Sequence, residues 1–321
     1  MASIRFAIPK GSLQEETVKF LSDAGYRIKG LDRSYRPKIN DPDIKLKLLR
    51  PQEIPYLVEA GYHDIGITGY DWIIESGADV DILLDLEYGW VKLVIAVPKN
   101  LDSIDSLNEL LETWDKESRT LRISTEYPNI AVSHLMNNDV YRRLYGDIEP
   151  QVVTPWWVKG DNPDVRIYLS FGATEAKPPE DSDAILDVTA TGTTLERNNL
   201  KVIEEIMEST AVLIANKEAM KDSRREKIMD IKALLRGVIE GRKRVHIFLN
   251  VGEENLSKIL DLLPALKSPT ISKLARDGWY SINTVLLEEE FLRILPSIRR
   301  LAQGLVVYRP KQILMLDGEV L

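Results

Sequence analysis

The amino-acid sequence predicts an α/β protein that ends in a separate small domain of βαββαβ order. Short apolar runs alternate with segments of helical periodicity along most of the chain, which is typical of α/β units. The last segment, residues 242–321, has its own order of strands and helices. At 321 residues, the chain is also long enough for two or three domains.

The first elements set this alternation. Ile4 to Pro9 is a short apolar run that ends at Lys10-Gly11, and apolar residues then recur at helical spacing from residue 13 to residue 24. Proline at position 51 is typical of a first helical turn. The pattern continues as a strand over 45–50, a helix over 51–60, a strand over 64–68 and a helix near 71–76.

The middle and the end of the chain repeat the alternation. Further strands are expected over 91–97, 119–124, 150–157, 184–188 and 211–215, with helices over 105–114, 128–142, from 195 onwards and over 218–240. Residues 177–183 are rich in proline and acidic residues, which predicts a loop. The last domain is expected as strand 245–251, helix 254–263, strands 270–274 and 280–287, helix 288–303 and strand 305–308, the split βαβ order of ferredoxin-like domains.

Charge and composition exclude several classes of function. The 50 acidic residues outnumber the 42 basic ones, and the formal net charge of -8 disfavours binding to nucleic acid or anionic membranes. Basic residues at 224–227 and 242–244 are interrupted by acidic ones, so a solvated helix face or subunit contact is expected there. The sequence has no cysteine and no long uncharged apolar run, which favours a cytoplasmic protein without disulfides or membrane spans.

The strongest local motif is the segment 184–195, in which an apolar strand leads into Asp187, a loop of small hydroxyl residues and a helix. Backbone N–H groups and threonine hydroxyls in such a loop can hold a phosphate, and Asp187 can accept hydrogen bonds from an attached sugar. A plain strand-to-helix turn, with threonines capping the helix, is the alternative. The segment is neither a Walker loop nor a dinucleotide fingerprint. It resembles the phosphoribosyl pyrophosphate loop of phosphoribosyltransferases.

Six motifs in order extend the resemblance to nearly the whole chain. They are the segments 8–13, 50–55, 64–71, 125–128, 187–200 and 268–271. With them the sequence resembles the long form of the ATP phosphoribosyltransferases, which catalyse the first step of histidine biosynthesis. The chain departs from the family's pattern at the 177–183 loop and at Ala173-Thr174, where other members commonly have Ser-Val.

The resemblance implies a bilobed core similar to type II periplasmic binding proteins, followed by a ferredoxin-like, ACT-like regulatory domain. Lobe I would comprise 1–98 with 201–219, lobe II 99–200 with the phosphoribosyl pyrophosphate loop at 187–195, a linking helix 220–241, and the regulatory domain 242–321. The reaction would join N1 of the adenine of ATP to C1 of phosphoribosyl pyrophosphate, release pyrophosphate and require Mg²⁺.

Residue roles also follow from the resemblance. Asp187, Glu175, Lys10 and Arg50 would be catalytic, with Asp187 or Glu175 a possible Mg²⁺ ligand. The phosphoribosyl pyrophosphate would be bound by Asp187, Thr189, Ala190, Thr191, Gly192, Thr193 and Thr194. ATP would be bound by Lys10, Gly11, Arg50, Tyr70, Asp71 and Tyr127. L-Histidine would inhibit the enzyme as an effector at Thr270 and Leu266, in a homo-oligomer between dimer and hexamer.

Each of these residues also has a simpler interpretation. Taken alone, Lys10 and Arg50 are typical solvated residues at strand ends, Asp71 could cap a helix, and Tyr127 could serve packing alone. The three histidines have no metal-ligand spacing and receive no role. Two other functions stay open: a phosphoribosyltransferase for another base, and a non-catalytic bilobed sensor of small ligands.

Overall fold

The computed structural model describes residues 3–263 and 268–314 of the chain. The chain divides into two compact units. One unit contains residues 1–4, 15–46 and 220–321, and the other contains residues 5–14 and 47–219.

A five-stranded sheet is the first of the two large sheets of the core. Its order is β4-β1-β5-β14-β6, with β1 and β5 parallel and β14 antiparallel to β5 and β6. The strands are β1 (Ile4–Pro9), β4 (Ile44–Leu49), β5 (Ile65–Gly69), β6 (Asp81–Asp85) and β14 (Ala211–Ala215). Helices η1 (Pro51–Glu53), α2 (Ile54–Glu59) and α3 (Tyr70–Ser76) flank β5 along the chain.

Close packing of α2 on β5 depends on Gly66. A Cβ atom at this position would lie 2.4 Å from Ile54 Cγ2 and 3.1 Å from Val58 Cγ2. Because real Cβ atoms do not approach other heavy atoms so closely, only glycine lets the helix lie this near the strand.

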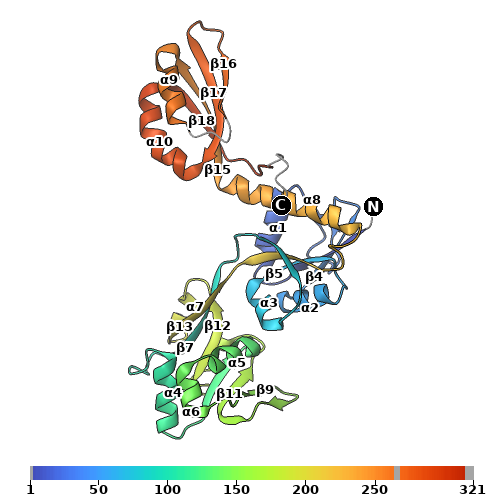
Figure 1. Cartoon of the computed structure of the whole chain (residues 1–321), viewed down its shortest axis with the longest axis vertical. Coiled ribbons are helices and arrows are strands. Elements are labelled where there is room, and N and C mark those ends of the chain that lie inside the picture. Colours follow the sequence, from blue (N-terminus) through green and yellow to red (C-terminus); the bar gives the residue numbers. More distant parts are fainter. Residues whose placement is uncertain (1–2, 264–267, 315–321) are drawn as a thin grey trace. The chain divides into compact units, whose positions relative to one another are not determined.

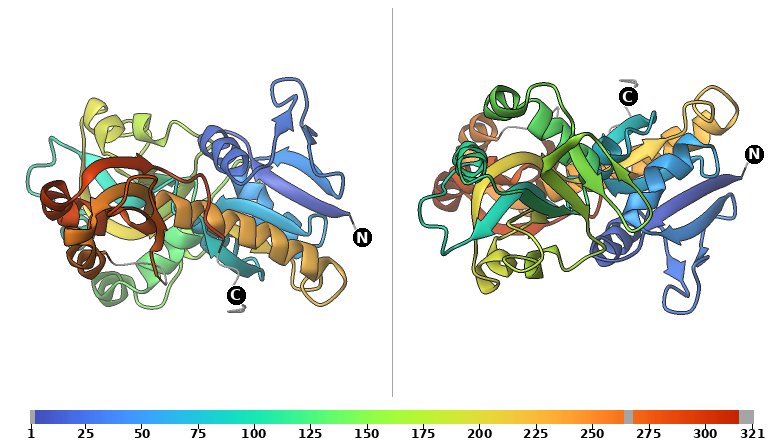
Figure 2. Two further views of the ribbon diagram at one scale, coloured as in Figure 1. Left: turned by 90° about the horizontal axis from the view of Figure 1, so that it is seen from above. Right: turned by 90° about the horizontal axis from the view of Figure 1, so that it is seen from below.

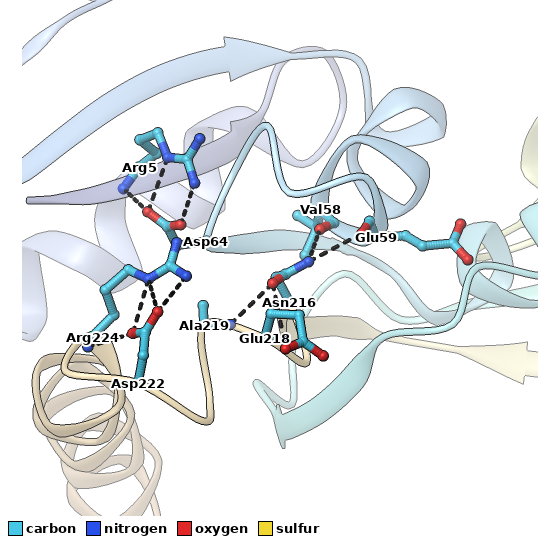
Figure 3. A network of polar contacts seen from close by, with 9 residues as sticks. All are labelled: Arg5, Val58, Glu59, Asp64, Asn216, Glu218, Ala219, Asp222 and Arg224. Carbon is cyan, nitrogen blue, oxygen red and sulfur yellow. Dashed lines mark hydrogen bonds and ion pairs between the residues drawn. The ribbon is translucent and has the colours of Figure 1, made fainter.

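Polar contacts hold the amino end of β5, away from Tyr70 and Asp71 at its other end (Figure 3). Asp64 Oδ2 accepts hydrogen bonds from the Arg5 backbone N (2.7 Å) and Nε (3.2 Å), and Asp64 Oδ1 pairs with Arg5 Nη2 at 2.5 Å. The Asn216 amide donates to the carbonyl oxygens of Val58 (2.9 Å) and Glu59 (3.0 Å). These contacts are structural, since they lie at the opposite end of β5 from the candidate site described below.

A seven-stranded sheet is the second large sheet of the core. Its order is β10-β9-β11-β8-β12-β7-β13. The strands are β7 (Val91–Pro98), β8 (Leu121–Thr125), β9 (Pro150–Val153), β10 (Val158–Lys159), β11 (Asn162–Leu169), β12 (Ala184–Thr189) and β13 (Leu200–Ser209). Helices α4 (Leu107–Lys116), α5 (Pro128–Met136) and α6 (Asp139–Tyr145) contribute to its buried apolar core, which includes Leu111, Trp114 and Tyr141.

Four neighbouring strands of this sheet, β9, β11, β8 and β12, are parallel. Their carboxyl ends therefore meet at one edge, where ligands commonly bind in α/β sheets. The segments that follow these strands are 154–157 after β9, 170–175 after β11, 126–127 after β8 and 190–192 after β12.

The sheets divide the chain differently from the expected lobes. Residues 91–98 and 201–209 were expected in lobe I, but they belong to β7 and β13 of the seven-stranded sheet. The reason is pairing: β7 lies antiparallel to both β12 and β13. Residues 15–46 group with residues 220–321 rather than with the rest of the first lobe.

The single helix expected over 128–142 is two helices, α5 and α6. Asn138 separates them, because its side-chain oxygen accepts hydrogen bonds from the backbone N–H groups of Val140 (2.9 Å) and Tyr141 (3.0 Å). This is N-cap geometry, which begins a new helix.

The other unit contains α1 (Gln14–Asp23), the hairpin β2 (Ile28–Lys29) and β3 (Lys38–Ile39), and the long helix α8 (Arg224–Arg242) (Figure 2, hairpin and α1 in blue, α8 in orange). Lys227 of α8 bonds to Asp41 at 2.7 Å, and the Arg242 guanidinium lies 4.6 Å from the Phe20 ring centroid. The basic residues of α8 thus contact this unit's own acidic and aromatic side chains.

The C-terminal domain has the predicted βαββαβ order. Its elements are β15 (Arg244–Gly252), α9 (Glu253–Leu262), β16 (Thr270–Lys273), β17 (Trp279–Leu287), α10 (Glu288–Leu301) and β18 (Gln303–Tyr308). The antiparallel sheet has the order β16-β17-β15-β18, and α9 and α10 pack on one of its faces (Figure 1). The ferredoxin-like prediction is confirmed.

Candidate active site

The segment 189–194 turns sharply from β12 into the short helix α7 (Thr193–Arg197). Gly192 has a φ of 77°, a left-handed conformation that favours glycine, and its N–H donates to Thr189 Oγ1 at 2.9 Å. The hydroxyls of Thr191 and Thr193 lie 2.9 Å apart, and both residues are exposed. The N-cap of α7 is Gly192, so the alternative in which threonines cap this helix does not describe the turn.

Asp187 lies two residues before the end of β12 and is half-buried. Its Oδ1 accepts a hydrogen bond from the Val188 N–H at 2.7 Å, and its side chain is also bonded to Thr174. Burial, and to a smaller extent the nearby carboxylates of Glu126 and Glu175, raise the pKa of Asp187 to about 6, although the hydrogen bond from Val188 acts in the opposite direction. Three acidic side chains from three segments thus lie close enough to interact.

Glu175 belongs to the short 3₁₀ helix η2 (Thr174–Ala176), which follows the left-handed residues Gly172 and Ala173. Glu126 directly follows β8 and accepts a hydrogen bond from the Gln52 amide at 3.2 Å. Glu175 was predicted as a site residue, whereas Glu126 was not. The sequence does contain a signal for Glu126. It lies between an apolar strand and Tyr127, in the segment 125–128, which is one of the six motifs of the family resemblance.

Lys10, Gly11 and Arg50 come together where β1 and β4 end. The Lys10 N–H donates to the carbonyl of Leu49 at 2.7 Å. A Cβ atom at Gly11, whose φ is 109°, would lie 3.4 Å from Arg50 Nη1. Arg50 is connected by a single residue to Gln52, which contacts Glu126. Arg50 therefore belongs to the segment that contacts Glu126, and Lys10 lies beside the start of that segment.

Asp71 and Tyr127, both predicted to bind ATP, contact each other. The Tyr127 hydroxyl donates to Asp71 Oδ2 at 2.7 Å, and the Ser209 hydroxyl donates to Asp71 Oδ1 at 2.6 Å. Both residues are buried, and the Tyr127 ring stacks on Trp72 at 4.3 Å between ring centroids. Burial, and then the charge of Asp71, raises the pKa of Tyr127. Tyr70, the neighbouring predicted residue, is 36% exposed.

A second carboxylate of α3 reaches α5 and was not predicted. Glu75 Oε1 and Oε2 accept hydrogen bonds from the backbone N–H groups of Asn129 (3.0 Å) and Ile130 (2.9 Å). Asn129 in turn donates its side-chain amide to the Glu75 carbonyl at 2.9 Å. Burial raises the pKa of Glu75 to about 7, although the two backbone hydrogen bonds act in the opposite direction.

The predicted effector residues lie in the C-terminal domain. Thr270 begins the edge strand β16, is exposed, and lies opposite Asn283 of β17. Leu266, the other predicted effector residue, lies outside the described residues.

The described residues contain few features that point to a metal centre or a membrane span. Over 3–263 and 268–314, no group of three or more histidine or acidic side chains is arranged to hold a metal ion. Mg²⁺ is commonly bound by one or two carboxylates together with substrate phosphates and water, and the carboxylates of Asp187 and Glu175 fit that pattern. Within the same ranges, no helix is both long and apolar enough to cross a membrane.

A half-buried aspartate near the end of β12, followed by an exposed hydroxyl loop at the carboxyl edge of parallel strands, is typical of enzymes that bind a phosphorylated sugar. A family model described as ATP phosphoribosyltransferase matches residues 50–237, and a model described as HisG, C-terminal domain, matches residues 241–310. The chain belongs to the ATP phosphoribosyltransferase family.

Relatives and a solved structure agree with this assignment. The ATP phosphoribosyltransferase of Thermodesulfovibrio yellowstonii is 39% identical over 312 residues, which cover 95% of this chain and 96% of the relative. That of Pelotomaculum thermopropionicum is 37% identical, with coverages of 92% and 94%. The ATP phosphoribosyl transferase (HisG:HisZ) complex from Thermotoga maritima has a chain with a TM-score of 0.56 and 26% identity, covering 74% of this chain and 98% of that one.

The reaction is therefore that of the first step of L-histidine biosynthesis. ATP and 5-phosphoribosyl 1-pyrophosphate give N1-(5-phosphoribosyl)-ATP and pyrophosphate. The predicted family is confirmed, and so is the predicted α/β architecture of a two-sheet core with a C-terminal ferredoxin-like domain.

Proposed function

We propose that phosphoribosyl pyrophosphate binds at the carboxyl edge of the seven-stranded sheet, with its ribose at Asp187 and its 5′-phosphate at residues 189–194. One observation carries the proposal: the half-buried Asp187 carboxylate directly precedes a glycine turn whose threonine hydroxyls are exposed. Charge-assisted hydrogen bonds from hydroxyls and backbone N–H groups to a phosphate each contribute about 1.5–3 kcal/mol.

The three neighbouring carboxylates of Asp187, Glu175 and Glu126, here called the acidic group, have a direct role in the chemistry. N1 of the adenine attacks C1 of the ribose, the new N–C bond forms as the C1–O bond breaks, and pyrophosphate leaves with the electron pair. Positive charge develops on the ribose during this displacement. The carboxylates of Asp187, Glu175 and Glu126 stabilise that charge, and no protein nucleophile is required.

Lys10 and Arg50 bind the polyphosphate groups of ATP and of the departing pyrophosphate. Gly11 supports this role, since it lies beside Arg50 Nη1 and its φ of 109° is a conformation that other residues rarely adopt. Tyr70 is exposed enough to contact ATP directly. Asp71 and Tyr127 act by positioning, because each is buried and bonded to the other.

Mg²⁺ would bind together with the substrate phosphates, and the carboxylates of Asp187 and Glu175 are the protein groups that would hold it. The ion would supply positive charge to neutralise the leaving pyrophosphate. Two polyphosphates add further negative charge to a protein whose formal net charge is already -8, which supports the requirement.

L-Histidine binds the C-terminal domain near Thr270 and inhibits the reaction. Thr270 and Asn283 offer an exposed hydroxyl and an amide on neighbouring strands, groups that can bind an amino acid. Inhibition of this kind is a coupling free energy between two distinct sites. The working form is a cytoplasmic homo-oligomer between dimer and hexamer, in which residues 220–241 link the catalytic core to the regulatory domain 242–321.

A steady-state assay of the full chain tests these proposals together. Pyrophosphate formation is measured with ATP, phosphoribosyl pyrophosphate and Mg²⁺, with and without histidine, in the native chain and in Thr270→Val, with Ser272→Ala as the control. We expect histidine to inhibit the native chain and the control, and to inhibit Thr270→Val much less. Equal inhibition of all three would remove Thr270 from the effector site. Activity with orotate or free purines instead of ATP would indicate a phosphoribosyltransferase for another base. Ligand binding without turnover would indicate a non-catalytic sensor of small ligands.

A further inference from the structure

Two large aromatic side chains are exposed side by side near the candidate active site. The rings of Trp156 and Phe171 form an edge-to-face pair with centroids 5.8 Å apart and planes inclined at 77°. Trp156 is 72% exposed and Phe171 is 70% exposed. Neighbouring aromatic rings left uncovered to this extent mark a surface that binds something.

Thr154 fixes the backbone of the Trp156 turn. The Thr154 hydroxyl oxygen accepts hydrogen bonds from the N–H groups of Trp156 (3.2 Å) and Trp157 (3.0 Å), and the hydroxyl donates to the Trp157 carbonyl at 3.0 Å. Because the backbone is held while the ring is exposed, the ring can bind a flat ligand at a small cost in conformational entropy.

The pair lies on the edge of the sheet that carries the phosphate loop. Trp156 follows β9 and Phe171 follows β11, and both strands are parallel to β8 and β12. Neighbouring strands lie about 4.8 Å apart, so β9 is about 14 Å from β12 along the sheet. A phosphate, a ribose and a purine placed end to end can bridge such a span.

The acidic group lies between the aromatic pair and the phosphate loop. Phe171 directly precedes Gly172, at which a Cβ atom would lie 3.7 Å from Glu126 Oε1. Three residues further on, Thr174 is bonded to Asp187. A base stacked on the pair would therefore approach the ribose from the side of Glu126 and Glu175.

We propose that Trp156 and Phe171 form the stacking platform for the adenine of ATP. Stacking uses the flat face of the base and leaves its N1 edge free for attack on the ribose. The inference rests on the proposed binding of phosphoribosyl pyrophosphate at Asp187. A purine fits this surface better than a second protein chain, because the pair lies beside the acidic group and the phosphate loop.

The test compares Trp156→Ala and Phe171→Ala with the conservative variant Trp156→Phe and the control Trp157→Ala, which removes the neighbouring ring of the same turn. We expect each alanine variant of the pair to raise the KM for ATP by about 5- to 100-fold, the range typical of base–aromatic stacking. The KM for phosphoribosyl pyrophosphate should stay unchanged. Trp156→Phe should recover most of the affinity, and Trp157→Ala should behave like the native chain.

Calorimetric titration with ATP alone and with inorganic tripolyphosphate isolates the base. The alanine variants should lose affinity for ATP by the same factor and keep their affinity for tripolyphosphate. Unchanged ATP affinity in both alanine variants would overturn the inference, as would a change in oligomeric state as their only effect. Asp187→Asn tests the underlying proposal separately: if this variant keeps full activity, the phosphate-loop assignment fails whatever Trp156 does.

Discussion

The hydroxyl of Tyr127 donates a 2.7 Å hydrogen bond to Asp71 Oδ2, which joins the segment after β8 to the first turn of α3. Ser209, the last residue of β13, supplies the second donor to the same carboxylate. Three segments that are distant in the sequence therefore meet at one buried charge, which connects the two sheets of the core at the candidate site.

Tyr127→Phe is expected to lower the free energy of unfolding by about 1–3 kcal/mol, because it leaves a buried carboxylate oxygen without its donor. Chemical denaturation measures the change, and a double-mutant cycle with Asp71→Asn measures the coupling between the two residues. A variant of native stability with a strongly raised KM for ATP would show instead that Tyr127 contacts the nucleotide directly.

Glu75 should make stability depend on pH. Its folded-state pKa is raised from 4.5 to about 7, so the native state binds a proton that the unfolded chain has released. The stabilisation is complete below pH 4.5 and is lost as the pH rises to 7, by roughly 2–3 kcal/mol. Denaturation of the native chain and Glu75→Gln across this range measures the effect. A difference between the two chains that does not change with pH would contradict the assignment.

Because the pKa of Asp187 is raised to about 6, we expect the enzyme's activity to fall on the acidic side of its pH profile. Protonation near pH 6 removes the charge that accepts hydrogen bonds from the ribose, so kcat/KM for phosphoribosyl pyrophosphate should fall as the pH drops below about 6. Initial rates from pH 5 to 8 test this. A profile that stays flat through pH 6, with an intact fold by circular dichroism, would exclude Asp187 as the titrating group.

In Glu126→Gln, the acidic fall in kcat/KM should occur at a lower pH than in the native chain. The Glu126 carboxylate is one of the causes of the raised pKa of Asp187, and the amide removes its charge while keeping its size. Gln52→Ala is the matched control, since it removes the hydrogen bond to Glu126 and leaves the charge. The prediction fails if both variants have the same profile as the native chain.

Most of the fold could be predicted from the sequence because its elements have strong local signals. The strand before Asp187, the glycine turn after it and the complete order of the last domain depend on short-range patterns, and the structure has them where they were expected. Strands β11 and β13 were missed. In β11, Asn162-Pro163 and two charged residues interrupt the apolar pattern. In β13, Ile203 and Ile206 recur at the spacing of a helix, and pairing with β7 decides the outcome.

The candidate site was predicted in part. Asp187, Glu175 and the threonine loop carry their own motif, and the structure brings them together. The roles of Glu126 and Glu75 depend on contacts with residues 74 and 55 positions away, which no local pattern encodes. The hydrogen bond between Asp71 and Tyr127 could likewise not be predicted from the sequence, although both residues were predicted to bind ATP.

Binding of phosphoribosyl pyrophosphate by Asp187 and its loop is tested most directly by the magnesium-dependent initial rate of Asp187→Asn against the native chain, with each substrate varied in turn. We expect kcat/KM for phosphoribosyl pyrophosphate to fall by about 100-fold or more, which corresponds to the loss of two charge-assisted hydrogen bonds, and the KM for ATP to change little. Equal rates in the two proteins would contradict the account.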